Sequence, residues 1–199
     1  MNLLTIDDLL ELAESAKVLD NRHEYLLSLP WAKEGIYYNF LYLLAQQMQP
    51  NVIVELGVHH GTGTAHFVWG APLAKYHGVD IDLSSKLASF TVPDEQPEGH
   101  LMFFRMTSLE FAENRKAVNA HQPNHYPPID ILFIDTDHTT EQCLAEYHAF
   151  LPLMTKGGVI LFDDIFMDGM KGVWPAIAEP KVILPDLHAN LGFGAAIIQ

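Results

Sequence analysis

The sequence predicts an α/β protein with a doubly wound, seven-stranded and mostly parallel sheet that is preceded by N-terminal helices. Short apolar runs alternate with segments of helical periodicity, an order typical of repeated βαβ units. A glycine-rich loop follows the first apolar run, Val52 to Val54, and aspartates follow two later runs. Because ligands bind at the carboxyl ends of parallel strands, these positions favour a binding crevice at that edge of the sheet.

The length and composition fit one folded domain. The chain has 199 residues, of which 49% are hydrophobic and 18% are charged. This length suits a single α/β domain, and the apolar content is sufficient for a sizeable core. We therefore expect a single domain over residues 1–199, with residues 1–48 as a helical N-terminal extension.

The charge balance argues against two classes of partner. The formal net charge is −14, whereas nucleic-acid or anionic-membrane binding needs a surplus of Lys and Arg, although a local basic patch is compatible with this average. Cys143 is the only cysteine, no apolar run reaches membrane-spanning length, and acids stand where a secretion signal is basic. We expect a cytoplasmic protein without a nucleic-acid or membrane partner.

Two helices are predicted before the first strand. Thr5 begins a capping-box pattern for a helix that ends at Ala16, and Gly35 to Met48 has apolar residues at helical spacing. The intervening Leu26 to Lys33 is interpreted as a loop, in which Trp31 either borders a substrate pocket or packs the helix layer. We expect this part to cover the substrate side or to form a subunit contact in a homo-oligomer.

The glycine loop after the first strand is typical of a nucleotide-type site. Glu55 ends the strand, and Gly57, Gly61 and Gly63 follow before a helix begins near Ala65. The glycines allow a sharp turn and a close approach of the backbone to a ligand, and a helix N-terminus presents N–H groups. The spacing differs from the G-x-G-x-x-G of dinucleotide sites, and no Gly-Lys-Ser/Thr follows as in a P-loop.

This pattern, E-x-G-x-x-x-G-x-G, resembles the cofactor loop of class I S-adenosylmethionine-dependent methyltransferases. The resemblance implies a Rossmann-like methyltransferase fold, with Glu55, Gly57, Gly61 and Gly63 at the cofactor. The methionine part of that cofactor carries an amino group and a sulfonium, which suit a nearby acid. The residues alone also permit a tight turn in another α/β protein.

Two further residues are candidates for cofactor contacts. A second strand is predicted over Tyr76 to Ile81, and Asp80 near its end either binds ribose hydroxyls, as the resemblance implies, or is a turn residue before a helix at Ser84 to Ser89. A third strand over Leu101 to Arg105 precedes Ser108. This serine resembles the one that lies near the adenine in the family, and it is also a good helix N-cap.

The rest of the sheet is predicted from four apolar runs, which are Ile129 to Ile134, Val159 to Phe162, Lys181 to Leu184 and Phe193 to Ile198. Thr139 starts a helix that ends near Pro152, Lys156 to Gly158 is interpreted as its C-terminal stop, and a short helix is expected over Gly169 to Glu179. Strands one, four and five are neighbours at the switch point of such a sheet, so their terminal residues should converge on one cleft.

Three carboxylates, those of Asp135, Asp163 and Asp164, end the fourth and fifth predicted strands. Carboxylates that lie close together repel one another unless they are protonated or bound to a cation. We expect an oxygen-preferring ion such as Mg²⁺ or Ca²⁺, because these carboxylates have no cysteine partner that would favour a softer metal. The alternative is that Asp163 or Asp164 only caps the following turn.

The strings FIDTDH and KGGVILFDD, separated by a helix, are similar to those of metal-dependent O-methyltransferases. That group includes catechol-type enzymes, macrolide sugar O-methyltransferases and cephalosporin hydroxylase-like relatives. The resemblance covers roughly Gly35 to Ile177. His59-His60 and Met106-Thr107 depart from the family pattern, which leaves the cofactor contacts there open.

The same resemblance implies roles for four residues. Asp135, Asp163 and Asp164 would hold Mg²⁺, with Asp135 also beside the cofactor. His138 stands three residues past the first of these ligands, where the sugar-modifying enzymes have their base. From the residues alone, His138 is also a helix-start residue that bonds to backbone or adenine.

The predicted function is methyl transfer from S-adenosylmethionine to a hydroxyl of a small molecule, assisted by a divalent cation. The cation would lower the pKa of the acceptor hydroxyl, and His138 would take its proton before an in-line displacement. The alternatives are a hydroxylase-like or other enzyme on the same scaffold and a non-catalytic cofactor-binding protein. An RNA methyltransferase is disfavoured by the negative charge and by the lack of an N-P-P-Y-like motif after the fourth strand.

Overall fold

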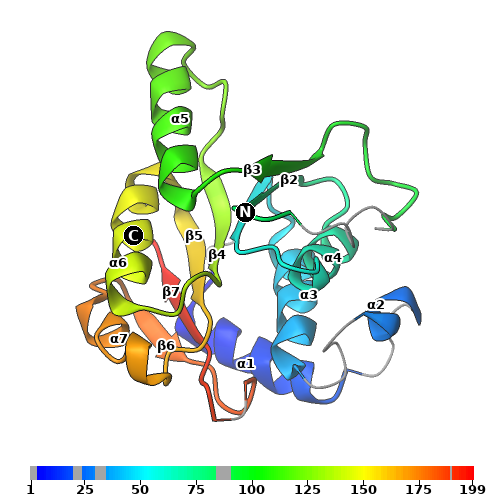
Figure 1. Cartoon of the computed structure of the whole chain (residues 1–199). Coiled ribbons are helices and arrows are strands. Elements are labelled where there is room, and N and C mark those ends of the chain that lie inside the picture. Colours follow the sequence, from blue (N-terminus) through cyan, green and yellow to red (C-terminus); the bar gives the residue numbers. More distant parts are fainter. Residues whose placement is uncertain (1–3, 20–23, 30–34, 84–90, 189) are drawn as a thin grey trace.

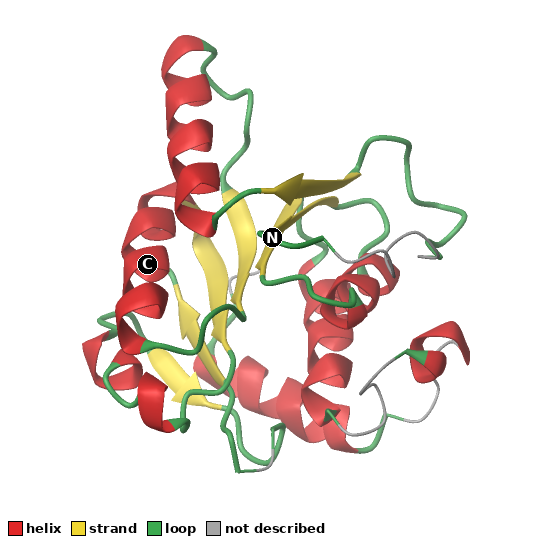
Figure 2. Cartoon of the chain, viewed as in Figure 1, coloured by secondary structure: helices red, strands yellow, loops and turns green. Residues whose placement is uncertain are grey.

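A seven-stranded sheet lies between two layers of helices in the computed structural model, which describes residues 4–19, 24–29, 35–83, 91–188 and 190–199 (Figures 1 and 2). The strands are β1 Val52–Leu56, β2 Lys75–Asp80, β3 Leu101–Arg105, β4 Ile129–Ile134, β5 Met154–Phe162, β6 Lys181–Ile183 and β7 Gly194–Ile197. The α-helices are α1 Ile6–Lys17, α2 Glu24–Ser28, α3 Ile36–Met48, α4 Thr62–Gly70, α5 Ser108–His121, α6 Thr140–Phe150 and α7 Val173–Ala176.

The strand order is β3-β2-β1-β4-β5-β7-β6. The first five strands are parallel, and β7 runs antiparallel to both β5 and β6. The predicted fold class, a doubly wound and mostly parallel seven-stranded sheet, is therefore confirmed. The order reverses between β1 and β4, so the crevice expected at a topological switch point lies at their carboxyl ends.

Alternation along the central strands explains why most of their residues are apolar. In β1, Ile53 faces the core formed with α1, α3 and α4, whereas Val52 and Val54 face the core formed with α5, α6 and α7. Figure 1 shows these two groups of helices on opposite sides of the sheet. Because successive side chains point to opposite faces, a strand covered on both faces is a continuous apolar run.

The N-terminal helices follow the predicted pattern with one correction. Thr5 caps α1 through a reciprocal capping box with Asp8, and Leu9 packs the helix against α3. The segment predicted as a loop from Leu26 begins within a helix, because α2 extends to Ser28. Trp31, together with the predicted helix at Ser84 to Ser89, lies outside the described residues.

The predicted helix stop at Lys156 to Gly158 is wrong, because these residues belong to β5. Gly157 N–H donates to the carbonyl of Ile198 at 2.7 Å, and Ile198 N–H donates to that of Gly158 at 2.9 Å. Helix α6 ends earlier, at Phe150, and a 3₁₀ turn over Leu151–Leu153 connects it to the strand.

Two other helices also differ from the sequence interpretation. The helix expected near Ala65 begins at Thr62, because Gly61 serves as its N-cap. The helix expected over Gly169 to Glu179 is reduced to a 3₁₀ turn at Asp168–Met170 and the short α7. Pro175 lies within that single turn, which agrees with the low tolerance of helix interiors for proline.

A buried histidine beneath α5 predicts an acid-sensitive stability. Arg115 Nη1 donates to His77 Nδ1 at 3.1 Å, and Nη2 donates to the carbonyl of Pro127. Burial, followed by the charge of Arg115, lowers the pKa of His77 to about 4. Between about pH 6.5, the ordinary pKa of histidine, and about pH 4, His77 is protonated in the unfolded chain but stays neutral in the folded chain. The free energy of unfolding therefore decreases as pH falls from about 6.5 towards 4.

We expect His77→Gln, which keeps an acceptor for Arg115 but does not titrate, to remove this sensitivity. Between pH 7 and pH 5 the wild-type protein should lose about 2 kcal/mol more unfolding free energy than the variant. Urea unfolding at both pH values measures this difference. Equal losses in the two proteins would contradict the account.

Candidate active site

The glycine loop is held tightly between the ends of β2 and β4. Gly57 has φ +87°, its N–H donates to the carbonyl of Val79 at 2.9 Å, and a Cβ at this position would lie 1.7 Å from the carbonyl oxygen of Asp135. Gly61 has φ +80° and begins α4. Only glycine is tolerated at position 57, because a Cβ would overlap the backbone of Asp135 and because φ is in the left-handed region.

Glu55 points beneath this loop. It is buried, and its Oε2 accepts from Thr64 Oγ1 at 2.6 Å and from the Tyr76 hydroxyl. Its Oε1 lies 2.2 Å from the position that a Cβ on Gly63 would take, so Gly63 leaves room for the carboxylate. Burial raises the pKa of Glu55 well above its ordinary value. The residue therefore supports the loop and also borders the cavity that Tyr37 and Tyr38 line.

A cavity of about 550 Å³ lies beyond the loop, at the ends of β2 and β3. Asp80 borders it and accepts from the N–H groups of His59 at 2.9 Å and Asp82 at 2.8 Å. The first of these bonds ties the glycine loop to the end of β2. The cavity thus combines an acid fixed by backbone donors with the apolar side chains of Val79 and Met106.

Ser108 lies at the far side of this cavity, in a buried polar network that the sequence interpretation did not identify. Its hydroxyl donates to Glu146 Oε1 at 2.5 Å, and Gln142 Nε2 reaches both Ser108 and Glu146. Burial raises the pKa of Glu146, while its three side-chain donors, including Thr136, lower it. Glu146 could not be identified from the sequence, because it belongs to no motif and a buried acid on the inner face of a helix interrupts the apolar pattern.

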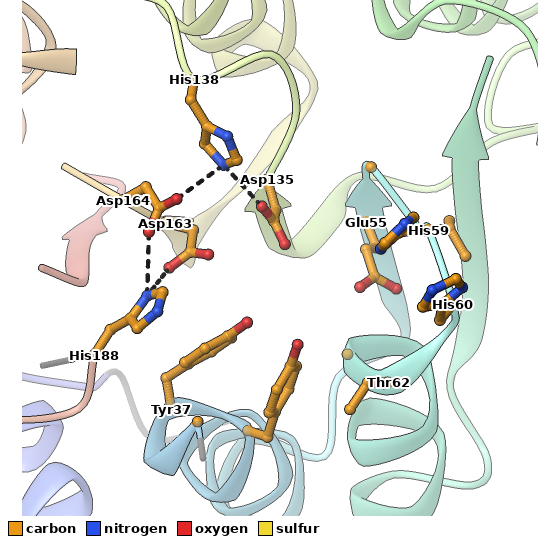
Figure 3. A pocket seen from close by; sticks show the side chains of 15 residues that line it. Tyr37, Glu55, His59, His60, Thr62, Asp135, His138, Asp163, Asp164 and His188 are labelled. Carbon is orange, nitrogen blue, oxygen red and sulfur yellow. Dashed lines mark hydrogen bonds and ion pairs between the residues drawn. The ribbon is translucent and has the colours of Figure 1, made fainter. Parts of the chain in front are cut away.

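The three predicted aspartates converge, as Figure 3 shows, and two histidines flank them. His138 Nε2 lies 3.1 Å from Asp135 Oδ1 and 3.4 Å from Asp164 Oδ2. His188 Nδ1 lies 2.9 Å from Asp163 Oδ1 and 3.3 Å from Asp164 Oδ1. The sequence interpretation did not include His188, because it lies in the irregular segment between β6 and β7.

Two of these residues have left-handed backbone conformations, with φ +46° at His138 and φ +54° at Asp164. Such conformations are uncommon outside glycine and gather at functional sites. The hydrogen bond that His138 donates to Asp135 raises the pKa of His138. Burial, together with the charge of Asp135, raises the pKa of Asp163. The cluster thus holds excess negative charge that hydrogen bonds to His138 and His188 only partly offset.

A second cavity, of about 390 Å³, opens beside this cluster and is bordered by Tyr37 and Tyr38 from α3. The Tyr37 ring packs on His188 with 4.8 Å between ring centroids. The two cavities share four bordering residues, which are Gly57, His59, Asp135 and His138. They are therefore two halves of one crevice, and the shared residues lie where the halves meet.

Within the described residues, two groups of three side chains have ligand atoms within 4.8 Å of one another. One group is Asp135, His138 and Asp163, and the other is Asp163, Asp164 and His188. Asp163 belongs to both groups, so Asp135 and Asp164 each lie close enough to Asp163 to share an ion with it. No helix among the described residues has the length and apolar character needed to cross a membrane.

Residues 54–165 match the family described as a methyltransferase domain. This match covers more than half of the chain, so the chain belongs to that family. The matched region includes the glycine loop, Asp80, Ser108 and the aspartates at the ends of β4 and β5. The resemblance to methyltransferases noted from the sequence is thereby confirmed.

Curated relatives are rhamnosyl O-methyltransferases of mycobacteria. The protein of Mycobacterium tuberculosis is 23% identical over 146 residues, which is 70% of this chain and 55% of that protein. The protein of Mycobacterium leprae is 25% identical over 126 residues, covering 62% of this chain and 52% of that protein. The chain spans about half the length of the curated relatives it matches.

Solved structures with the same fold are also O-methyltransferases. The enzyme of Bacillus cereus, in complex with SAH, is 16% identical with a TM-score of 0.63 over 97% of this chain and 90% of that chain. TomG of Streptomyces achromogenes, in complex with SAM, is 18% identical with a TM-score of 0.61 over 100% and 92%. A TDP-rhamnose 3'-O-methyltransferase of calicheamicin biosynthesis is 17% identical with a TM-score of 0.59 over 98% and 95%. At these identities the likeness shows the fold.

Proposed function

We propose that this chain is an S-adenosylmethionine-dependent enzyme that methylates a hydroxyl of a small molecule with the help of a divalent cation. The observation that carries the proposal is the continuous crevice. Its glycine-loop half, bordered by Asp80 and Ser108, and its Asp-His half, bordered by Asp163 and His188, meet at Asp135 and His138. Family membership supports methyl transfer. The names of the relatives, rhamnosyl O-methyltransferase, support a sugar hydroxyl as the acceptor.

The glycine-loop half fits S-adenosylmethionine, which supplies an electrophilic methyl group when bound. Asp80 would accept hydrogen bonds from ribose hydroxyls, since its carboxylate borders the cavity and is oriented by two backbone donors. Ser108 and Met106 would border the adenine. Gly61 and Gly63, with Glu55 beneath them, would lie at the methionine end.

The Asp-His half fits a divalent cation, which when bound would acidify an acceptor hydroxyl. Asp164 Oδ1 is buried without a hydrogen-bond partner among the described residues, and it borders the cavity. Asp135 and Asp163 complete a set of carboxylates that would repel one another without a counter-ion. These three side chains would hold the ion.

His138 is placed to take the proton of the acceptor. It borders both halves of the crevice, and Asp135 orients its imidazole and favours the protonated form. The acceptor oxygen would form a bond to the methyl carbon as the carbon–sulfur bond breaks, and the proton of the hydroxyl would pass to the imidazole of His138. The remaining product is S-adenosylhomocysteine. Tyr37 and Tyr38 would cover the acceptor side.

Calorimetry and a transfer assay test this function. S-adenosylmethionine should bind the wild-type protein, and Asp80→Ala should weaken the binding strongly. Mass spectrometry should then find a methylated product from a panel of rhamnose-containing acceptors, with activity lost in excess EDTA. Unchanged affinity in Asp80→Ala, tighter binding of NAD, or full activity in EDTA would each reject the corresponding part of the proposal.

We expect His138→Ala to lower turnover by about 10²- to 10⁴-fold, because it removes the proposed base. Binding of the cofactor and the metal should persist, since the three carboxylates and the glycine loop remain. Steady-state kinetics and calorimetry measure these effects separately. His121→Ala, at the exposed end of α5, is the matched control and should behave as wild type. An unchanged rate in His138→Ala would remove the base role while leaving the metal proposal standing.

A further inference from the structure

His188 borders the crevice, and the function described above gives it no role. It lies between β6 and β7, and its Nδ1 faces the carboxylates at the end of β5, at 2.9 Å from Asp163 and 3.3 Å from Asp164 (Figure 3). A nitrogen in this position can either hydrogen-bond to the carboxylates or share an ion with them. The distances fit both roles, and the buried Asp164 Oδ1, which has no hydrogen-bond partner among the described residues, favours the second.

Contacts on two sides hold the imidazole in place. The Tyr37 ring packs against it, and Tyr37 N–H donates to the carbonyl of Leu187 at 3.0 Å. The carbonyl of His188 accepts from the N–H groups of Leu191 and Gly192, each at 3.0 Å. The segment is therefore tied both to α3 and to the turn before β7, so the ring enters the crevice already oriented.

The spacing of the atoms matches a coordination shell. First-row divalent ions bind imidazole nitrogen and carboxylate oxygen at about 2.0–2.2 Å, so neighbouring ligand atoms of an octahedron lie about 3 Å apart. Nδ1 of His188 lies 2.9 Å and 3.3 Å from one oxygen of each carboxylate. Asp164 Oδ1, which has no hydrogen-bond partner among the described residues, is one of these two oxygens.

We propose that His188 is a nitrogen ligand of the cation and that the cation is a first-row transition metal such as Mn²⁺ rather than Mg²⁺. This inference rests on the proposed cation site and specifies its ligands. Mg²⁺ prefers oxygen ligands and retains several waters, whereas an imidazole nitrogen suits first-row transition ions, and Mn²⁺ is the member of that row that also accepts carboxylates and water. The expectation of an all-oxygen Mg²⁺ site followed from a sequence interpretation that lacked His188.

The two histidines then have separate tasks. His138 borders both halves of the crevice and contacts Asp135, so it meets the acceptor where the cofactor ends. His188 borders only the half that contains Tyr37 and Tyr38. If His188 binds the ion from that side, coordination positions of the ion that face the acceptor stay available. His138 is then free to exchange a proton with the acceptor.

The test is metal binding to protein stripped with EDTA and freed of chelator. By calorimetry, the wild-type protein should bind Mn²⁺ at least about tenfold more tightly than Mg²⁺, and His188→Gln should lose most of that preference by weakening Mn²⁺ about 10- to 100-fold. Pulsed EPR of the Mn²⁺-loaded protein should show ¹⁴N coupling from an imidazole in the wild type and in His138→Gln, but none in His188→Gln. Thermal unfolding of each variant establishes that it is folded.

A second variant separates ligation from orientation of Asp163. His188→Glu offers an oxygen in place of nitrogen, and it should bind both ions with little preference. Equal affinity of wild-type protein for Mn²⁺ and Mg²⁺, ¹⁴N coupling that survives in His188→Gln, or coupling lost only in His138→Gln would each overturn the inference. Binding of S-adenosylmethionine is measured independently, so failure of the metal assignment is distinguishable from failure of the proposed methyl transfer.

Discussion

Gly57→Ala is expected to abolish detectable S-adenosylmethionine binding and to reduce the unfolding free energy by about 3 kcal/mol or more. The added Cβ would lie 1.7 Å from the carbonyl oxygen of Asp135, and the residue has φ +87°. Backbone cannot move aside as a flexible side chain can. The overlap would push the glycine loop away from β4 and displace Asp135, which borders both halves of the crevice. Calorimetry and urea unfolding measure the two effects.

Gly99→Ala is the matched control for this prediction. Gly99 has a similar φ of +77°, but a Cβ there would have no heavy atom within 4 Å. It therefore reports the backbone strain of a left-handed alanine, about 1 kcal/mol, without the steric overlap. Cofactor binding should be unaffected. If Gly57→Ala bound the cofactor normally, or if Gly99→Ala were equally damaging, the close approach of the loop to β4 would not explain the effect.

The parallel strands could be predicted because the pattern of apolar and polar residues that identifies each strand lies within a short stretch of sequence. A strand covered on both faces, such as β4, is apolar at all but one position and ends abruptly in polar residues. Lys156 to Gly158 were misassigned because two adjacent glycines favour a turn on local grounds. Gly158 belongs to β5 for a tertiary reason, since a Cβ there would lie 3.0 Å from the carbonyl of Asp130.

The site residues divide in the same way. Asp135, Asp163 and Asp164 could be predicted to meet, because they end neighbouring parallel strands whose order follows from the fold class. His188 could not, because its position depends on how the antiparallel β7 inserts between β5 and β6. The N-terminal part was expected on the substrate side, but the contact of Tyr37 with His188 was out of reach in the same way. This contact depends on the packing of α3 against the segment before β7, which joins two distant parts of the chain.

Asp164→Ala should remove divalent-cation binding and reduce methyl transfer by at least about 100-fold. Asp164 places both carboxylate oxygens in the cluster, one towards His138 and one towards His188, so no neighbour can substitute for it. In the wild-type protein, added Mn²⁺ should raise the melting temperature because the ion binds only the folded state. That rise should disappear in the variant, while S-adenosylmethionine still binds.

The control for Asp164→Ala must introduce alanine with the same backbone strain, because Asp164 has φ +54°. Asn124 has φ +67° in the exposed loop between α5 and β4, so Asn124→Ala introduces alanine into a similar conformation outside the crevice. Its metal binding and methyl transfer should equal those of the wild type. If Asp164→Ala retained the Mn²⁺-dependent rise in melting temperature, the ion would not be held by the end of β5. If both variants lost activity alike, backbone strain rather than loss of a metal ligand would be the cause, since Asn124 lies outside the crevice.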